Sequence, residues 1–227
     1  MKNRTALAIA IVAALNSSLV VAHEAGDIIL RVGAAQVAPD ESSTLVSTTA
    51  TGALAATSVG VDDNTQLGLN LVYMQSDSLA VEVLAATPFE HDLSVAGLGQ
   101  YGFSTTNLGS TKHLPPTVSA LYFLGGSGSF IRPYLGLGAN YTAFFSKDLS
   151  AQASSELGAS GLDLDDSWGL SARAGIDVQL SNNWILNASA WAIDIDTDAN
   201  FNSALGNVSA SVEIDPIVYM ISLGYKF

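Results

Sequence analysis

The chain has 227 residues, of which 21 are acidic and 8 are basic, so its formal net charge at pH 7 is −13. Binding to nucleic-acid phosphates requires clustered Lys and Arg, and this charge balance therefore argues against a nucleic-acid partner. The absence of cysteine excludes disulfide bonds and thiolate metal sites.

The N-terminal segment predicts a secretory signal peptide. It opens with Lys2 and Arg4, continues with an apolar run over 6–15, and ends in small residues up to Ala22. The run is about ten residues long, whereas a membrane-spanning helix needs roughly twenty. We therefore expect residues 1–22 to be removed and residues 23–227 to form one domain.

The composition favours a β-barrel in a membrane. The mean hydropathy is +0.34 and only 13% of residues are charged. Yet no stretch after residue 22 approaches the ~18 uninterrupted apolar residues of a spanning helix. A transmembrane barrel reconciles these facts because only alternate residues of its strands face lipid.

Eight segments alternate apolar with small or polar residues, as strands with one apolar face do. The pattern is clearest from Trp168 to Leu180 and in the C-terminal segment that ends at Phe227. Each segment has about 9–13 residues, enough to cross a bilayer when tilted. In chain order they are 28–37, 65–73, 79–89, 116–124, 134–145, 168–180, 184–192 and 217–227.

Long and short connections alternate between these segments. The short ones, 75–78, 125–130 and 181–183, are rich in turn-forming residues. This arrangement predicts an all-β fold, an eight-stranded antiparallel transmembrane barrel with up-and-down topology and four long extracellular loops. The last strand should close the barrel against the first. A soluble lipocalin-like barrel is the alternative, although its outside should carry more charge. Aromatic residues near the strand ends fit two interfacial girdles: Tyr73, Tyr122, Tyr141, Phe145, Trp168, Trp184, Tyr225 and Phe227.

Several stretches resemble the OmpW family of small outer-membrane barrels, which includes AlkL-like alkane uptake proteins. The most specific are AATPF (85–89), HLPPT (113–117) and the terminal segment DPIVYMISLGYKF (215–227). The loops 40–60 and 92–111 carry no matching motif.

This resemblance implies a monomeric barrel in the bacterial outer membrane with a narrow, largely hydrophobic lumen. Small hydrophobic solutes would cross the lipopolysaccharide layer and leave sideways into the membrane lipid. Tyr225 and Phe227 would form the C-terminal signal for the barrel assembly machinery. The alternative function is a structural, adhesive or receptor barrel without transport.

The residues at inward-facing strand positions predict that the two ends of the barrel interior differ in polarity. Near the periplasmic end we expect a polar plug of Arg31, Glu82, Arg173, Asp177 and Lys226, because opposite charges in a confined space pair. Structural packing without a role in transport is the alternative reading of these charges. Towards the outer end we expect an apolar lumen, lined by Val72, Met74, Leu84, Phe144, Trp191 and Ile193.

Three prolines predict a lateral opening in the barrel wall. Pro88 lies late in the third strand, and Pro115 and Pro116 open the fourth. Proline cannot donate a ladder hydrogen bond, and unpaired backbone in lipid is costly unless it lines a cavity. Alternatively, these prolines lie above the membrane and only shape a loop.

Six carboxylates lie near the outer ends of the last three strands: Asp166, Asp194, Asp196, Asp198, Glu213 and Asp215. They could bind divalent cations that bridge lipopolysaccharide phosphates, but we expect a solvated acidic rim and no metal or cofactor. We also expect no enzymatic activity, because no Gly-x-Ser-x-Gly elbow accompanies His91 and His113.

Overall fold

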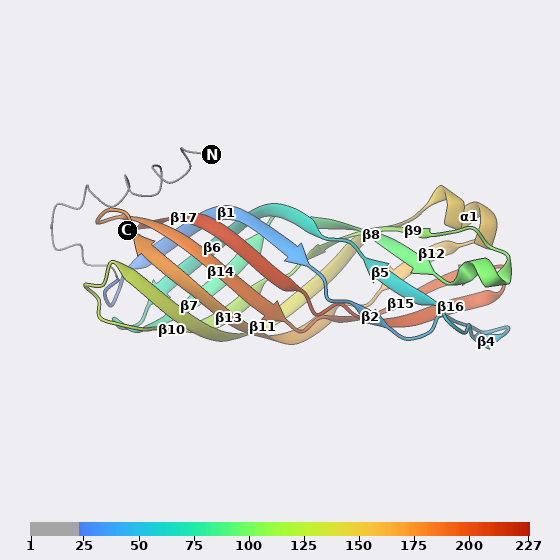
Figure 1. The fold of residues 1–227 in the computed structure, drawn as a ribbon, viewed down its shortest axis with the longest axis horizontal. Helices are drawn as coiled ribbons and strands as arrows, with labels where there is room; N and C mark the ends of the chain where they lie inside the picture. The colour runs from blue at the N-terminus through green and yellow to red at the C-terminus, as the bar shows by residue number, and fades with distance from the viewer. Residues whose placement is uncertain (1–22) are drawn as a thin grey trace, which may run out of the picture.

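Residues 23–227 are described by the structure, a computed structural model. The predicted signal peptide, residues 1–22, lies outside the described residues. Figure 1 shows an elongated body in which a barrel occupies one half and smaller sheets extend it. Within 23–227, no helix is long and apolar enough to cross a membrane.

Eight antiparallel strands close the barrel, as predicted. Each strand pairs with its neighbours along the chain, and the last pairs with the first. The strands are β1 (Ile28–Ala38), β6 (Asn64–Met74), β7 (Leu79–Ala86), β10 (Thr117–Phe123), β11 (Ile131–Leu149), β13 (Ser167–Gln179), β14 (Trp184–Ile193) and β17 (Ile217–Lys226).

Closure depends on the pairing of the two terminal strands. Ile29 of β1 lies opposite Lys226 of β17, and the register continues without a shift to Ala38 opposite Ile217. The Phe227 N–H also donates to the Ile28 carbonyl at 2.9 Å. The C-terminal alternation seen in the sequence is therefore the seam of the barrel.

The outer surface of the barrel is apolar. Leu137 and Leu170 are each 73% exposed and Ile221 is 68% exposed, which identifies the alternating apolar face as the outward one. Aromatic pairs border this surface at both ends: the Tyr141 and Trp168 rings are 4.6 Å apart, and those of Trp184 and Tyr225 are 5.0 Å apart. This surface fits lipid, whereas a soluble barrel would turn its apolar face inward.

The long connections fold into an extension at one end of the barrel, which we call the loop end. The opposite end, where the short turns and the C-terminus lie, is the turn end (Figure 1). Two small sheets, one helix and one 3-10 helix form the extension, including the loops 40–60 and 92–111. Its elements are β2 (Ser42–Ser43), β3 (Ser47–Thr48), β4 (Gly52–Ala53), β5 (Ser58–Val61), β8 (Phe89–Ala96), η1 (Leu98–Tyr101), β9 (Asn107–Leu114), α1 (Ala151–Leu157), β12 (Ser160–Leu164), β15 (Asp196–Ser203) and β16 (Gly206–Glu213).

The predicted third strand is wrong in one respect, because it is not continuous. It divides into β7 and β8, which are separated by Thr87 and Pro88. β7 pairs with β6 and β10 in the barrel, whereas β8 pairs with β5 and β9 in the extension. The chain thus leaves the barrel ladder where proline removes a backbone donor.

Candidate functional site

Four charged side chains form a layer across the barrel interior near the turn end. Arg31 donates to Glu82 at 3.1 Å and to Asp177 at 2.5 Å, and Arg173 pairs with Glu82. All four are at most 3% exposed. We call Arg31, Glu82, Arg173 and Asp177 the charged layer. Four of the five predicted plug residues are therefore brought together inside the barrel.

Neutral groups add hydrogen bonds to this layer. Arg173 donates to the Tyr134 hydroxyl at 2.6 Å, and Asn187 donates to the same hydroxyl at 2.9 Å and to Asp177 at 2.7 Å. Tyr134 fits because Gly175 lies beside its ring: a Cβ at Gly175 would come within 2.3 Å of the ring. The glycine thus allows the tyrosine to bind the charged layer from the side.

The fifth predicted plug residue, Lys226, lies opposite Ile29 of β1, closer to the turn end than Arg31. Its ammonium is 3.4 Å from a carboxylate oxygen of Asp27, and both side chains are partly exposed. Its membership of the plug stays a prediction.

Two side chains that the sequence did not identify lie below the layer. His23 is 2.7 Å from Asp177, and Arg132 donates to the His23 carbonyl at 3.3 Å and to the Asp77 carbonyl at 2.6 Å. The sequence pattern could have identified Arg132, because it lies two residues before Tyr134 and therefore on the same, inward face of the strand. The predicted strand began at Tyr134, two residues too late to include it.

Two predicted lumen residues, Val72 and Met74, lie at the turn end. They pack with Ile29 and Phe123 in an apolar cluster of buried residues there. β6 runs towards the turn end. Val72 lies opposite Ile29 in the ladder, and Ile29 is two residues closer to the turn end than Arg31. Placing Val72 and Met74 in the outer lumen was therefore wrong: they face inward, but at the level of the charged layer or below it.

Trp191 covers the charged layer from above. Its side chain is fully buried, and the Arg173 guanidinium lies 4.0 Å from the ring centroid. This is a close cation–π contact in a desolvated setting. Trp191 packs with Ile193 and Phe144 in the large apolar cluster of the loop-end half. It marks the boundary between the charged and apolar fillings.

Above this boundary the interior contains apolar cavities. One cavity of about 30 Å³ is lined by residues that include Phe144, His113 and Val37. A second of about 100 Å³ lies further out and shares Val59, Leu108 and Ala199 with the first. The lining of both cavities is almost entirely apolar, which suits an apolar guest.

A third, smaller cavity of about 10 Å³ lies beside the predicted wall opening. Its lining includes Leu84, Ala86, Pro115 and Ile193. Leu84 and Ile193 therefore line cavities in the outer half, as the sequence predicted, and Phe144 lines the neighbouring one.

The wall itself is interrupted at the prolines. The ladder between the third and fourth strands is paired at Leu84 with Thr117 and again at Phe89 with His113. Between these pairs, the described residues 85–88 form no ladder pair with residues 114–116. The Thr87 N–H donates to Leu67 of β6 at 2.9 Å. Successive N–H groups alternate in direction, so position 88 faces the fourth strand, where proline offers no donor.

A second interruption lies on the other side of Pro88. β6 and β7 are paired up to Gly68 opposite Ala86, and β5 and β8 resume at Val61 opposite Leu93. The wall thus lacks ladder pairs on both sides of Pro88. Only on the side of the fourth strand does a proline also remove the backbone donor.

Two histidines lie just above this wall. The Nε2 atoms of His91 and His113 are 2.9 Å apart, and His91 Nδ1 is 2.6 Å from the Asp62 carbonyl oxygen. The outward neighbours Glu90 and Lys112 form an exposed ion pair, so this part of the wall lies beyond the apolar surface. Burial lowers the pKa of both histidines, that of His113 to about 3. Both rings are therefore neutral at pH 7.

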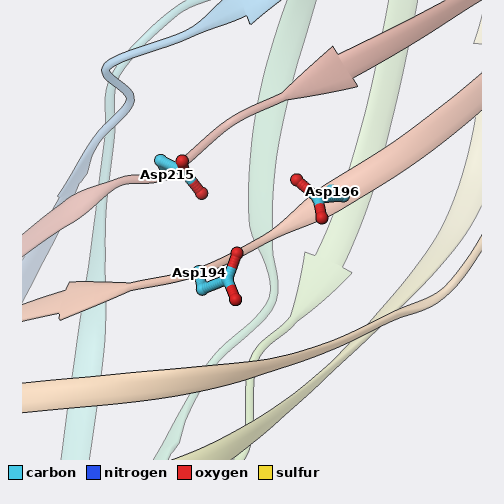
Figure 2. A group of neighbouring side chains, drawn as sticks. All are labelled: Asp194, Asp196 and Asp215. Carbon is cyan, nitrogen blue, oxygen red and sulfur yellow. The ribbon is translucent and has the colours of Figure 1, made fainter.

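The structure brings together three of the six predicted rim carboxylates. Figure 2 shows Asp194, Asp196 and Asp215 on neighbouring segments, and their nearest carboxylate oxygens lie within 4.8 Å of one another. Partial burial raises the pKa of Asp196, and the charges of Asp194 and Asp215 raise it further. Oxygen ligands suit a hard cation, but all three residues are exposed to solvent.

Comparison with known proteins identifies the family. The sequence model described as the OmpW family matches residues 24–227. The chain belongs to the OmpW family. It is 46% identical to Outer membrane protein W of Vibrio cholerae, over 99% of each chain. The crystal structure of the outer membrane protein OprG from Pseudomonas aeruginosa matches with a TM-score of 0.86 and 41% identity, over 92% of this chain and 99% of that one. The chain is also 25% identical to the Dibenzothiophene metabolism operon protein PahQ of Pseudomonas aeruginosa, over 75% of each chain.

Membership of this family places the barrel in the bacterial outer membrane. In such barrels the short turns face the periplasm and the long loops face outward. The charged layer therefore lies on the periplasmic side of the interior and the apolar cavities on the extracellular side.

Proposed function

We propose that this barrel mediates passive uptake of small hydrophobic molecules. The solute enters the apolar cavities from the extracellular side and leaves sideways into the membrane beside Pro88. The observation that carries the proposal is the change of filling at Trp191: the cavities above it are apolar, and the layer below it consists of charged side chains that pair across the barrel. An apolar guest is favoured above this boundary and has no favourable route through it.

The interrupted wall supports the sideways route. A solute at the small cavity beside Ala86 and Pro115 lies next to the stretch where the third and fourth strands lack ladder pairs. Partition into lipid supplies the driving force, about 0.8 kcal/mol per methylene buried. No energy source is therefore required. The name of the related PahQ protein, which refers to the metabolism of an aromatic sulfur heterocycle, agrees with an apolar cargo.

The test is to restore the missing ladder donor. Pro88→Val gives position 88 an N–H that faces the fourth strand and favours strand pairing. We expect cells with this variant to take up a hydrophobic tracer more slowly than cells with the unaltered protein, at equal amounts of barrel in the membrane. Barrel stability should hold or rise.

The matched control is Pro133→Val, on β11, where the ladder with β13 is continuous on both sides of the proline. This variant should leave uptake unchanged. Unchanged uptake with a well-folded Pro88→Val barrel would remove the lateral route. Uptake no higher than that of cells without the barrel would instead favour a structural or adhesive role.

A further inference from the structure

The histidine pair above the wall has a hydrogen-bonding pattern that can be assigned atom by atom. A backbone carbonyl only accepts, so His91 Nδ1, 2.6 Å from the Asp62 carbonyl, carries a proton. His91 Nδ1 is also 3.7 Å from the Asp62 carboxylate, which favours the same proton. Since His91 is neutral, its Nε2 is an acceptor.

The partner ring follows from this assignment. The Nε2 atoms of His91 and His113 are 2.9 Å apart, and one of them must donate. His113 Nε2 therefore carries the proton, and neutral His113 presents a lone pair at Nδ1. This Nδ1 is buried and has no hydrogen-bond partner among the described residues. It is an unsatisfied acceptor.

The surroundings of His113 are apolar. Its ring stacks on Phe89 at 5.4 Å and lies 5.8 Å from the Phe144 ring. His113 and Phe144 both line the cavity of about 30 Å³, together with aliphatic residues such as Val37 and Leu164. A buried acceptor without a partner is costly, and native interiors supply one from protein, water or ligand.

We infer that His113 Nδ1 is a selectivity point for guests with one hydroxyl group on an apolar body, such as a phenol or an aliphatic alcohol. The hydroxyl donates to Nδ1 while the rest of the guest packs on Phe89 and Phe144. An ether of the same shape has no proton to donate, and a hydrocarbon has no polar group. This inference rests on the proposed function, since it names the solute class that the apolar cavities prefer.

The test compares 2-naphthol with 2-methoxynaphthalene, which share an aromatic body and differ in the hydroxyl proton. Binding to the mature barrel in lipid nanodiscs is measured by fluorescence, with empty nanodiscs as the blank for partition into lipid. One additional hydrogen bond should make 2-naphthol bind about fivefold more tightly. His113→Phe should abolish this preference while still binding the ether. Lys112→Gln, on the same strand but facing outward, should retain it.

A second measurement does not depend on a variant. On addition of 2-naphthol the ¹⁵N resonance of His113 Nδ1 should move, and 2-methoxynaphthalene should leave it in place. Equal binding of both probes by the unaltered barrel would overturn the inference and leave apolar uptake standing. A preference that survives in His113→Phe would overturn the assignment to this residue. Binding of neither probe above the blank would overturn the inference and the proposed function together.

Discussion

The two halves of the barrel interior are built from the same alternating strands and are filled in opposite ways. On the periplasmic side Arg31 and Arg173 pair with Glu82 and Asp177, and neutral hydrogen-bonding groups surround them. On the extracellular side aliphatic and aromatic side chains surround the cavities, and a small buried polar group of Thr117, Asn140 and Thr142 also faces inward. Trp191 separates the two.

This contrast teaches that strand periodicity fixes which residues point inward. The side-chain types at each position along the barrel axis then decide what the interior can contain. A narrow eight-stranded barrel leaves little room by default. Paired charges fill that room on one side, and large apolar side chains leave cavities on the other. Small changes in either half should therefore have different consequences.

Breaking the charged layer should have the largest effect. Asp177→Asn keeps the shape but removes the charge that faces Arg31 at 2.5 Å and His23 at 2.7 Å. An uncompensated buried charge costs about 3–5 kcal/mol, so urea unfolding from lipid vesicles should show a loss of that size. Planar-bilayer recordings should also show higher conductance than the low conductance expected of the unaltered barrel.

The matched control for this prediction is Asp163→Asn in the extracellular half. Asp163 pairs with Lys147 at 2.7 Å but is 69% exposed, and exposed pairs contribute about 1 kcal/mol or less. An equal loss of stability in both variants would show that the charged layer stabilises the barrel no more than an exposed ion pair does. A large stable conductance in the unaltered barrel would contradict a closed layer.

Acid should weaken the extracellular half before the charged layer. The pKa of His113 is lowered from 6.5 to about 3 by burial, with a smaller effect from His91. Between these values the unfolded chain binds more protons, so stability is complete above pH 6.5 and falls as the pH decreases towards 3. The loss should reach up to about 3 kcal/mol at pH 4. Urea unfolding at pH 7.5 and pH 4 measures it, and His113→Phe should remove most of the difference.

A contrary outcome here would be a pH dependence that is the same in the variant as in the unaltered barrel. The titrating group would then lie elsewhere, and the histidine pair would not be the pH-sensitive element of the extracellular half.

The smallest effect should come from the surface of the extension. Hydrogen bonds from Ser104 and Thr105 hold the pKa of Glu156 on α1 below its usual value, at about 2. The stabilisation is present above the ordinary pKa of a glutamate and is lost as the pH falls towards 2. Glu156→Gln should speed amide exchange in α1 at pH 7 and leave the barrel strands unchanged. Unaltered exchange in α1 would show that these bonds do not hold the helix.

The eight barrel strands could be predicted from the sequence because lipid imposes strict alternation on them. The alternate residues Leu67, Leu69, Leu71 and Tyr73, for example, all face outward. The folded extension could not be predicted, since strands such as β15 and β16 alternate small apolar residues with Asp, Asn and Ser that also suit loops.

Part of the candidate site could be predicted for the same reason. The alternation along each strand placed Arg31, Glu82, Arg173 and Asp177 inside the barrel, where the structure pairs them. Alternation did not show where a residue lies along the barrel axis. Val72 and Met74 were therefore assigned to the wrong half, although β6 runs towards the turn end. The histidine pair depends on β8 leaving the barrel ladder at Pro88, a change of partner strand that alternation does not encode.

The most direct test of this account is to locate a bound apolar guest by methyl NMR. The barrel, labelled at the methyl groups of Ile, Leu, Val and Met in lipid nanodiscs, is titrated with 2-methoxynaphthalene. The account predicts chemical-shift changes at Leu84 and Ile193, above the charged layer, and none at Ile29 and Met74, below it. Changes at Ile29 and Met74 of the same size would contradict it, because the guest would then pass through the charged layer.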